Sequence, residues 1–242
     1  MSNEKKDPDI FGKAIKAYFE NKDNEDIVVH SPDFDDDVIP VDYLFRSYAE
    51  MPPLEKMALQ LCRGKVLDVG CGAGSHALYL QNEKDLEVLA IDTSEGAIEV
   101  CKERGIKKAE NVAFEALSEE KFDTILLLMN GTGIVGKMRK LDAFFAKLKQ
   151  LLNPEGQVLI DSSDLIYLFE EDEDGGVWVD AGAGYYGELS YSLSYKGERS
   201  NYFDWLYLDF DSLSLAASKN GFSCELLKKG EHYDYLARLS VK

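Results

Sequence analysis

Residues 65–74, KVLDVGCGAG, constrain the fold of this chain more than any other stretch. The apolar run at residues 66–69 is typical of a buried parallel strand, and Asp68 stands near its carboxyl end. Three glycines follow at alternate positions: Gly70, Gly72 and Gly74. Glycine permits tight backbone angles and leaves space for a ligand. Because a helical pattern begins at Ser75, the stretch predicts the ligand-binding crevice of an open α/β sheet.

A second apolar run, residues 88–91, ends in Asp92, which lies 18 residues beyond Gly74. A carboxylate at this position can accept hydrogen bonds from both hydroxyls of a ribose, so the acid alone does not discriminate between nucleoside cofactors. Dinucleotide cofactors use the loop G-x-G-x-x-G, whose last glycine would fall on Ser75. The observed pattern is D-x-G-x-G-x-G, and this spacing disfavours a dinucleotide.

The pattern D-x-G-x-G-x-G resembles motif I of the class I S-adenosylmethionine (SAM) methyltransferases. Residues 122–130 and 151–164 resemble later motifs of the same family, so the resemblance covers residues 65–164 and recurs in the last helix and two strands. It implies an α/β fold with a Rossmann-like seven-stranded mixed sheet of order 3-2-1-4-5-7-6, flanked by helices. It also implies SAM as the cofactor and methyl transfer as the activity.

The resemblance assigns cofactor contacts near the ends of the first two strands. The backbone at the three glycines would lie along the methionine part of SAM, and Asp68 would hold its ammonium group. Asp92 would bind the ribose and Thr93 would touch the adenine. The family often places an acid after the third strand to bind the adenine amino group; here the backbone of Leu117 is the candidate.

Four further residues are candidates for the same site. Met129 and Asn130 end the fourth strand and face the crevice, where Asn130 either orients a polar group of the substrate or simply forms a turn. His76 is the only histidine near the glycine loop, and a lone histidine is more often structural. Arg46 precedes the first strand and either clamps a carboxylate over the site or forms an ion pair in a very acidic chain.

No catalytic residue and no metal site are predicted. Methyl transfer from SAM requires alignment and exclusion of water, and a base is needed only when the nucleophile carries a proton with a high pKa. The acidic run at residues 33–37 lacks the glycine and glutamate of a calcium loop. The acceptor atom stays open, because oxygen, nitrogen, carbon and sulfur acceptors all occur on this fold.

The chain divides into two parts. We expect residues 1–64 to form an N-terminal helical extension and cap, and residues 65–242 to form the SAM-binding domain. Alternating aromatic residues predict an inserted β-hairpin at residues 185–208, which is either a lid over the substrate or an extension of a sheet. We expect residues 1–8 to be disordered and residues 170–174 to be a solvated loop.

Composition limits the partners. The chain has 242 residues and a net charge of −18, which disfavours nucleic acids and anionic membranes. The first residues are charged and show no export signal, and no apolar run approaches a membrane span, so we expect a cytoplasmic protein with a small-molecule methyl acceptor. The oligomeric state is not predicted. The alternatives are a nicotinamide-dependent oxidoreductase and a non-catalytic SAM-binding protein.

Overall fold

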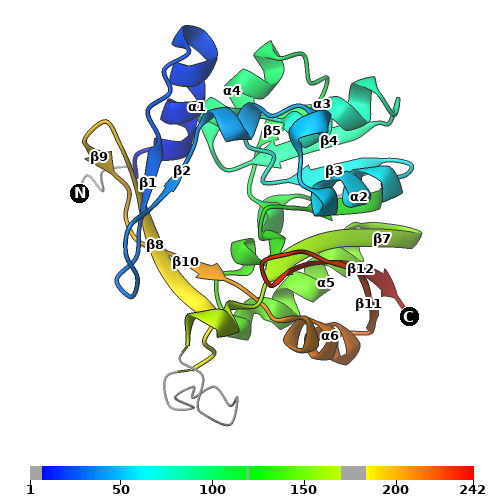
Figure 1. Cartoon of the computed structure of the whole chain (residues 1–242). Helices are drawn as coiled ribbons and strands as arrows, with labels where there is room; N and C mark the ends of the chain where they lie inside the picture. Colours follow the sequence, from blue (N-terminus) through cyan, green and yellow to red (C-terminus); the bar gives the residue numbers. More distant parts are fainter. Residues whose placement is uncertain (1–6, 119, 170–183) are drawn as a thin grey trace, which may run out of the picture.

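The computed structural model describes residues 7–118, 120–169 and 184–242. The expectations for residues 1–6 and 170–174 therefore lie outside the described residues. Within them, the chain forms a seven-stranded sheet and a smaller second sheet, with helices packed around both. Figure 1 shows the second sheet, with β1, β2 and β8, standing beside the larger one. No helix in these ranges is long and apolar enough to cross a membrane.

The larger sheet has the order β11-β12-β7-β6-β3-β4-β5. Its strands are β3 (Val66–Val69), β4 (Val88–Asp92), β5 (Ala109–Asn111), β6 (Phe122–Leu127), β7 (Leu152–Ser163), β11 (Phe222–Lys229) and β12 (Asp234–Val241). The strands from β5 to β7 pair in parallel, whereas β12 runs antiparallel to both β7 and β11. Counted along the chain, this is the order 3-2-1-4-5-7-6, so the predicted fold class is confirmed.

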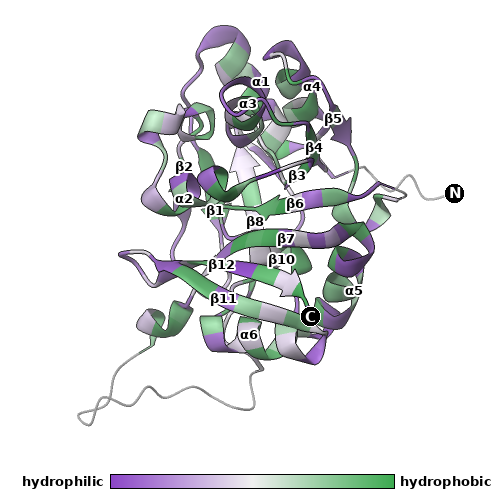
Figure 2. Cartoon of the chain, turned by 90° about the vertical axis from the view of Figure 1, so that its right-hand side faces the viewer, coloured by the Kyte–Doolittle hydropathy of each residue, from purple (hydrophilic) through white to green (hydrophobic). Residues whose placement is uncertain are grey.

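Helices cover both faces of this sheet. The helices are α2 (Pro53–Leu61), α3 (Ser75–Asn82), α4 (Glu95–Glu103), α5 (Leu141–Leu151) and α6 (Phe210–Lys219). On β3, Val66 belongs to the core under α2, α3 and α4, whereas Leu67 belongs to the core under α5 and α6. This alternation is the reason why parallel strands read as continuous apolar runs. Figure 2 shows hydrophobic residues concentrated along the central strands β6 and β7.

Two strand boundaries differ from the expectation. Apolar residues 112–114 indicate a third strand, but β5 ends at Asn111, and Phe114 begins the short 3₁₀ helix η3 (Phe114–Ala116). Residues 157–160 indicate a fifth strand, but β7 begins at Leu152, directly after α5, and ends at Ser163. The physical reason is pairing: Leu152 pairs with Phe122 of β6, and β12 runs beside β7 as far as Ser163.

The second sheet joins distant parts of the chain. It has the order β10-β8-β1-β2, all antiparallel, from strands β1 (Ile27–His30), β2 (Asp37–Ile39), β8 (Glu188–Tyr195) and β10 (Phe203–Leu206), with β9 (Glu198–Arg199) paired to β8. The predicted hairpin is present as β8 and β10. The N-terminal region is not helical throughout, because β1 and β2 lie within it and extend the hairpin into a sheet.

The first helix, α1 (Ile10–Asn21), packs between helix α4 of the larger sheet and strands β1 and β8 of the second sheet. Ile10 and Ala14 share a cluster with Ile27 of β1 and Tyr195 of β8. On its other side α1 contacts α4 at a pair of glycines: a Cβ added to Gly96 would lie 2.8 Å from the Gly12 backbone. The two helix backbones therefore approach as closely as glycine allows.

We predict that Gly96→Val destabilises the protein by about 1–3 kcal/mol, because the new side chain must push α1 away from α4. The measurement is the free energy of unfolding in urea. Lys102→Val is the matched control, since Lys102 lies on the exposed face of the same helix. Equal stabilities of the two variants would contradict close backbone packing between α1 and α4.

Candidate active site

The glycine turn lies between β3 and α3 at the carboxyl edge of the larger sheet. Its three glycines have left-handed φ angles of 71°, 52° and 82°. A Cβ on Gly74 would lie 2.3 Å from the Ile106 side chain, so protein packing requires this glycine. A Cβ on Gly70 would meet no atom within 4 Å. The turn is therefore packed tightly behind Gly74 and borders open space at Gly70, as a cofactor cradle requires.

The carboxylate of Asp92 holds this turn in place. Its Oδ2 accepts a hydrogen bond from the Gly72 N–H at 2.9 Å, and its Oδ1 accepts one from the Ser94 N–H at 2.9 Å. Burial raises the pKa of Asp92, and nearby Asp9 raises it further, against the lowering effect of these two N–H groups. Each carboxylate oxygen retains a lone pair. Asp92 can therefore still accept both hydroxyls of a ribose.

Asp68 lies at the carboxyl end of β3 with 2% of its surface exposed. Its Oδ2 has no hydrogen-bond partner among the described residues. Burial raises the pKa of Asp68 to about 6, while His76 and the Ala77 N–H lower it and Asp92 raises it. A buried carboxylate oxygen without a partner is costly unless a donor reaches it. Its chemistry fits an ammonium group.

A buried ion-pair network lies beside Asp68. Arg46 donates from Nη2 to both carboxylate oxygens of Glu55 at 2.7 Å, and His76 Nε2 lies 2.8 Å from Glu55 Oε2. Burial raises the pKa of Glu55, but His76 and Arg46 together outweigh it and hold this pKa below its usual range. Arg46 also donates from Nη1 to the Tyr43 carbonyl at 2.7 Å. Arg46 is therefore an ion-paired, buried arginine with most of its donors engaged.

The turn after β6 is built around Asp161. Met129 and Asn130 both have left-handed φ angles, of 67° and 61°. Asp161, on β7, accepts hydrogen bonds from the N–H groups of Met129 (3.0 Å) and Gly131 (2.9 Å). Burial raises the pKa of Asp161 to about 6 against these two bonds. The side chain of Asn130 accepts a hydrogen bond from the Ser163 hydroxyl at 3.0 Å, which supports its role in the turn.

The hairpin packs directly against the residues that follow this turn, which form the 3₁₀ helix η4 (Gly131–Val135). A Cβ on Gly133 would lie 1.9 Å from the Trp205 ring, so only glycine leaves room for β10. The Thr132 hydroxyl donates to the Leu206 carbonyl at 2.8 Å. The second sheet therefore stands next to the carboxyl end of β6, as a wall of the crevice would.

The two adenine candidates lie farther along the same edge. Thr93 is exposed and directly follows β4. Leu117 is buried after η3, and its carbonyl accepts a hydrogen bond from the Lys147 ammonium. The backbone nitrogen of Leu117 lies 3.3 Å from the carbonyl oxygen of Phe114, so the hydrogen bond between them is long.

Sequence reasoning missed two acidic residues of this site. Glu55 lies on α2 and touches His76 from a distant stretch of sequence, so no local pattern identified it. Asp161 directly follows the apolar residues 158–160, a pattern that marks it only as the end of a strand. A carboxylate at the end of a parallel strand beside a non-glycine turn is the signal that could have identified Asp161.

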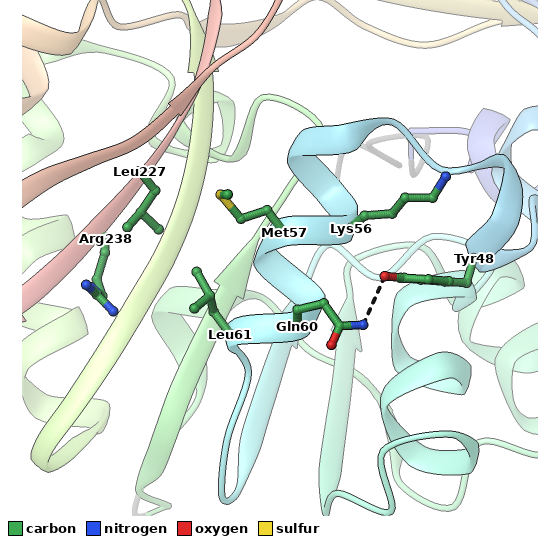
Figure 3. Close-up of a pocket in the computed structure, with 7 residues that line it drawn as sticks. All are labelled: Tyr48, Lys56, Met57, Gln60, Leu61, Leu227 and Arg238. Atoms are coloured by element: carbon green, nitrogen blue, oxygen red, sulfur yellow. Dashed lines mark hydrogen bonds between the residues drawn. The ribbon is translucent and has the colours of Figure 1, made fainter.

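The structure also has a surface hollow of about 450 Å³ between α2 and the β11–β12 pair (Figure 3). It is lined by Tyr48, Lys56, Met57, Gln60, Leu61, Leu227 and Arg238. None of these residues belongs to the glycine turn, the Asp92 end of β4 or the turn after β6. The hollow is therefore separate from the candidate active site.

Comparison with known proteins gives one match over 96% of the chain and others over shorter parts of it. A methyltransferase domain family model matches residues 66–156. A SAM-dependent methyltransferase from Bacteroides fragilis, solved with S-adenosyl-L-homocysteine (SAH), is 49% identical and has a TM-score of 0.89, with 96% of this chain and 94% of that one covered. The PH0226 protein from Pyrococcus horikoshii is 20% identical, has a TM-score of 0.57 over 78% and 88% of the chains, and shares the fold.

Curated relatives match over shorter stretches. Phosphoethanolamine N-methyltransferase 1 from Triticum aestivum is 33% identical over 103 residues, which cover 40% of this chain and 20% of that enzyme. The tRNA U34 carboxymethyltransferase from Pseudoalteromonas translucida is 34% identical over 106 residues, which cover 40% and 31%. The chain thus spans about a fifth to a third of the length of these relatives.

The strand order is that of the class I methyltransferase fold, and the glycine turn and the acid at the end of β4 lie at the edge of the sheet where such folds bind ligands. The chain belongs to the SAM-dependent methyltransferases, as its match to the Bacteroides fragilis enzyme shows. It is an enzyme, and its cofactor is SAM. The cradle at Gly70 and the unpartnered oxygen of Asp68 fit this cofactor. Neither a nicotinamide cofactor nor a non-catalytic role gains support from these matches.

We predict that ionisation of Asp68 destabilises the protein without cofactor. A carboxyl group whose pKa is raised on folding contributes stability that is complete below its unfolded pKa and is lost as the pH rises through the folded value, here about 6. The unfolding free energy of the wild type should therefore fall relative to Asp68→Asn by on the order of 1 kcal/mol between pH 5 and 8. Asp35→Asn, at an exposed carboxylate, is the control. Parallel pH profiles of wild type and Asp68→Asn would contradict the raised pKa.

Proposed function

We propose that this methyltransferase transfers the methyl group of SAM to a small molecule bound between the turn after β6 and the second sheet. The main observation behind the proposal is the packing of Trp205 on Gly133, because this contact places the hairpin beside the carboxyl ends of the strands of the larger sheet. In open α/β folds ligands bind at this edge. The hairpin is then both an extension of a sheet and a wall of the acceptor site.

The side chains at the strand ends have separate roles in this proposal. When bound, SAM supplies a methyl group already activated by its sulfonium. Asp68 binds the ammonium end, Asp92 binds the ribose, and the backbone of the glycine turn lies along the methionine part. Thr93 and Leu117 border the adenine. The protein's contribution is to align the acceptor and to exclude water.

Arg46 and His76 act through Glu55 in the same proposal. Glu55 pairs with both side chains, and its helix α2 leads into β3. The network thereby connects the N-terminal segment to the start of α3, next to Asp68. Breaking a buried ion pair by removing one partner costs about 3–5 kcal/mol. In this proposal Arg46 and His76 position the methionine end of the site, and the remaining Nη1 N–H of Arg46 is the candidate donor to the SAM carboxylate.

Charge supports a small acceptor. The chain carries a net charge of −18, which disfavours a tRNA substrate of the kind named for the Pseudoalteromonas translucida relative. The Triticum aestivum relative is named for methylation of a small amine. Met129, with 39% of its surface exposed, and Asn130 lie where cofactor and acceptor meet. The cytoplasmic location remains a prediction.

We predict that Gly70→Ala reduces the affinity for SAH at least tenfold, because the new methyl group enters the space of the cofactor. Isothermal titration calorimetry with SAH measures this. Gly105→Ala is the matched control: Gly105 also has a left-handed φ, of 95°, and a Cβ there also meets no atom within 4 Å. Both variants place an alanine in the left-handed region of the backbone. Equal SAH affinities of the two folded variants would place the cofactor elsewhere.

We predict that Asp92→Asn weakens SAH binding by about 1.5–3 kcal/mol, roughly 10- to 100-fold, because the ribose loses a charged acceptor. The variant also loses part of its hold on the Gly72 N–H, so the melting temperature without ligand should fall as well. Calorimetry and thermal unfolding measure the two effects. An unchanged SAH affinity in a folded Asp92→Asn protein would remove Asp92 from the cofactor site.

A further inference from the structure

One face of the second sheet is lined with aromatic and aliphatic side chains. Alternate residues of a strand share a face, and residues paired across antiparallel strands share it too. Phe203 pairs with Tyr191, and Leu193 pairs with Val29, which in turn pairs with Asp37. Asp37 therefore lies on the same face as Tyr191. It places a carboxylate on an otherwise apolar and aromatic surface.

This face is turned towards the candidate active site. At one end, Leu193 and Tyr195 pack in a cluster with α1, whose Phe11 ring would lie 3.9 Å from a Cβ on Gly72. At the other end, Trp205 packs on Gly133 of η4. The central part of the face, with Tyr191 and Asp37, consequently spans the distance between the glycine turn and the turn after β6.

Tyrosine hydroxyls gather at this central part. The hydroxyls of Tyr191 and Tyr207 lie 3.4 Å apart. Tyr167, half exposed at 50%, stacks on Tyr233 with ring centroids 5.1 Å apart. Burial raises the pKa of both Tyr191 and Tyr207, and the nearby Tyr167 and Asp37 raise both pKa values further. These tyrosines are uncharged at neutral pH, so Asp37 is the negatively charged member of the group and the rings supply aromatic faces beside it.

No free cation opposes this charge on the strands concerned. Strands β1, β2, β8 and β10 contain neither lysine nor arginine, and their one histidine, His30, lies 2.8 Å from the Asp36 carboxylate. Arg199 of β9 donates from Nε to the hydroxyl of Ser192, which lies on the opposite face from Tyr191. Lys137, which precedes α5, is shared between Glu188 of β8 and Asp204 of β10 at 3.5 and 3.4 Å. An anionic acceptor would meet Asp37 here without a compensating cation on these strands.

We propose that the methyl acceptor is an amine that carries a positive charge at neutral pH, and that Asp37 and the rings of Tyr167, Tyr191 and Tyr207 bind its ammonium group. This inference rests on the proposed position of the acceptor. A cation is attracted to the faces of aromatic rings, and a charge-assisted hydrogen bond to a carboxylate adds to this attraction.

Nitrogen is the methyl acceptor in this proposal. The ammonium releases one proton to water, and the free lone pair attacks the methyl carbon. The new carbon–nitrogen bond forms as the carbon–sulfur bond breaks, and its electron pair stays on sulfur to give SAH. The methylated amine is again positively charged, so Asp37 favours substrate and product alike.

The test measures binding of three matched probes to the SAH-saturated protein by ligand-observed NMR titration. Benzylamine is the cation, benzyl alcohol its neutral counterpart and benzoate the anion. We expect benzylamine to bind at least fivefold more tightly than either counterpart. Asp37→Asn should remove this preference while the SAH affinity stays unchanged. Asp35→Asn, which removes the same charge from the loop before β2 and not from the face of the sheet, should retain it.

Each other result overturns the inference. Equal or tighter binding of benzyl alcohol or benzoate contradicts an amine site, as does absence of benzylamine binding to the SAH complex. A benzylamine preference that survives Asp37→Asn places the cation site elsewhere. Failure of SAH itself to bind would instead contradict the proposed function, and calorimetry with SAH alone separates that failure from the others.

Discussion

The contact between the Asp92 carboxylate and the Gly72 N–H is the interaction on which the site depends. It fixes the middle of the glycine turn, whose first residues, Gly70 and Cys71, donate their N–H groups to the Ile91 carbonyl. The same carboxylate receives the Ser94 N–H, and Ser94 caps α4 through its hydroxyl. Asp9 then accepts hydrogen bonds from the Ser94 hydroxyl and the Gly96 N–H, both at 3.0 Å. Cofactor turn, α4 and α1 are therefore one connected unit.

The pairing of β1 with β8 holds the second sheet together. It joins residues 27–30 to an insertion more than 150 positions away and converts a two-stranded hairpin, which is marginal alone, into a sheet. This sheet is held by α1 at one end and by η4 at the other. Helix α1 thus contacts both α4 of the larger sheet and strands β1 and β8 of the second sheet.

The larger sheet could be predicted from the sequence because its strands are buried and its turns carry strong local signals. The apolar run that contains Asp68, the helix cap at Ser94 and the glycine after α4 each determine the backbone only within a few residues of their own position in the sequence. Strands β1 and β2 could not be predicted, because they are short and only their pairing to β8 stabilises them. Glu55 could not be predicted for the same reason: its partners Arg46 and His76 come into contact with it only in the folded protein.

The most direct test of this account is a crystal structure of the protein with SAH. We expect the ribose hydroxyls to lie within hydrogen-bond distance of Asp92 and the ammonium group to lie at Asp68. We expect the sulfur to be directed towards the turn at Asn130 and the second sheet. SAH bound anywhere else, such as in the hollow between α2 and the β11–β12 pair, would contradict it. So would a sulfur atom directed away from the second sheet.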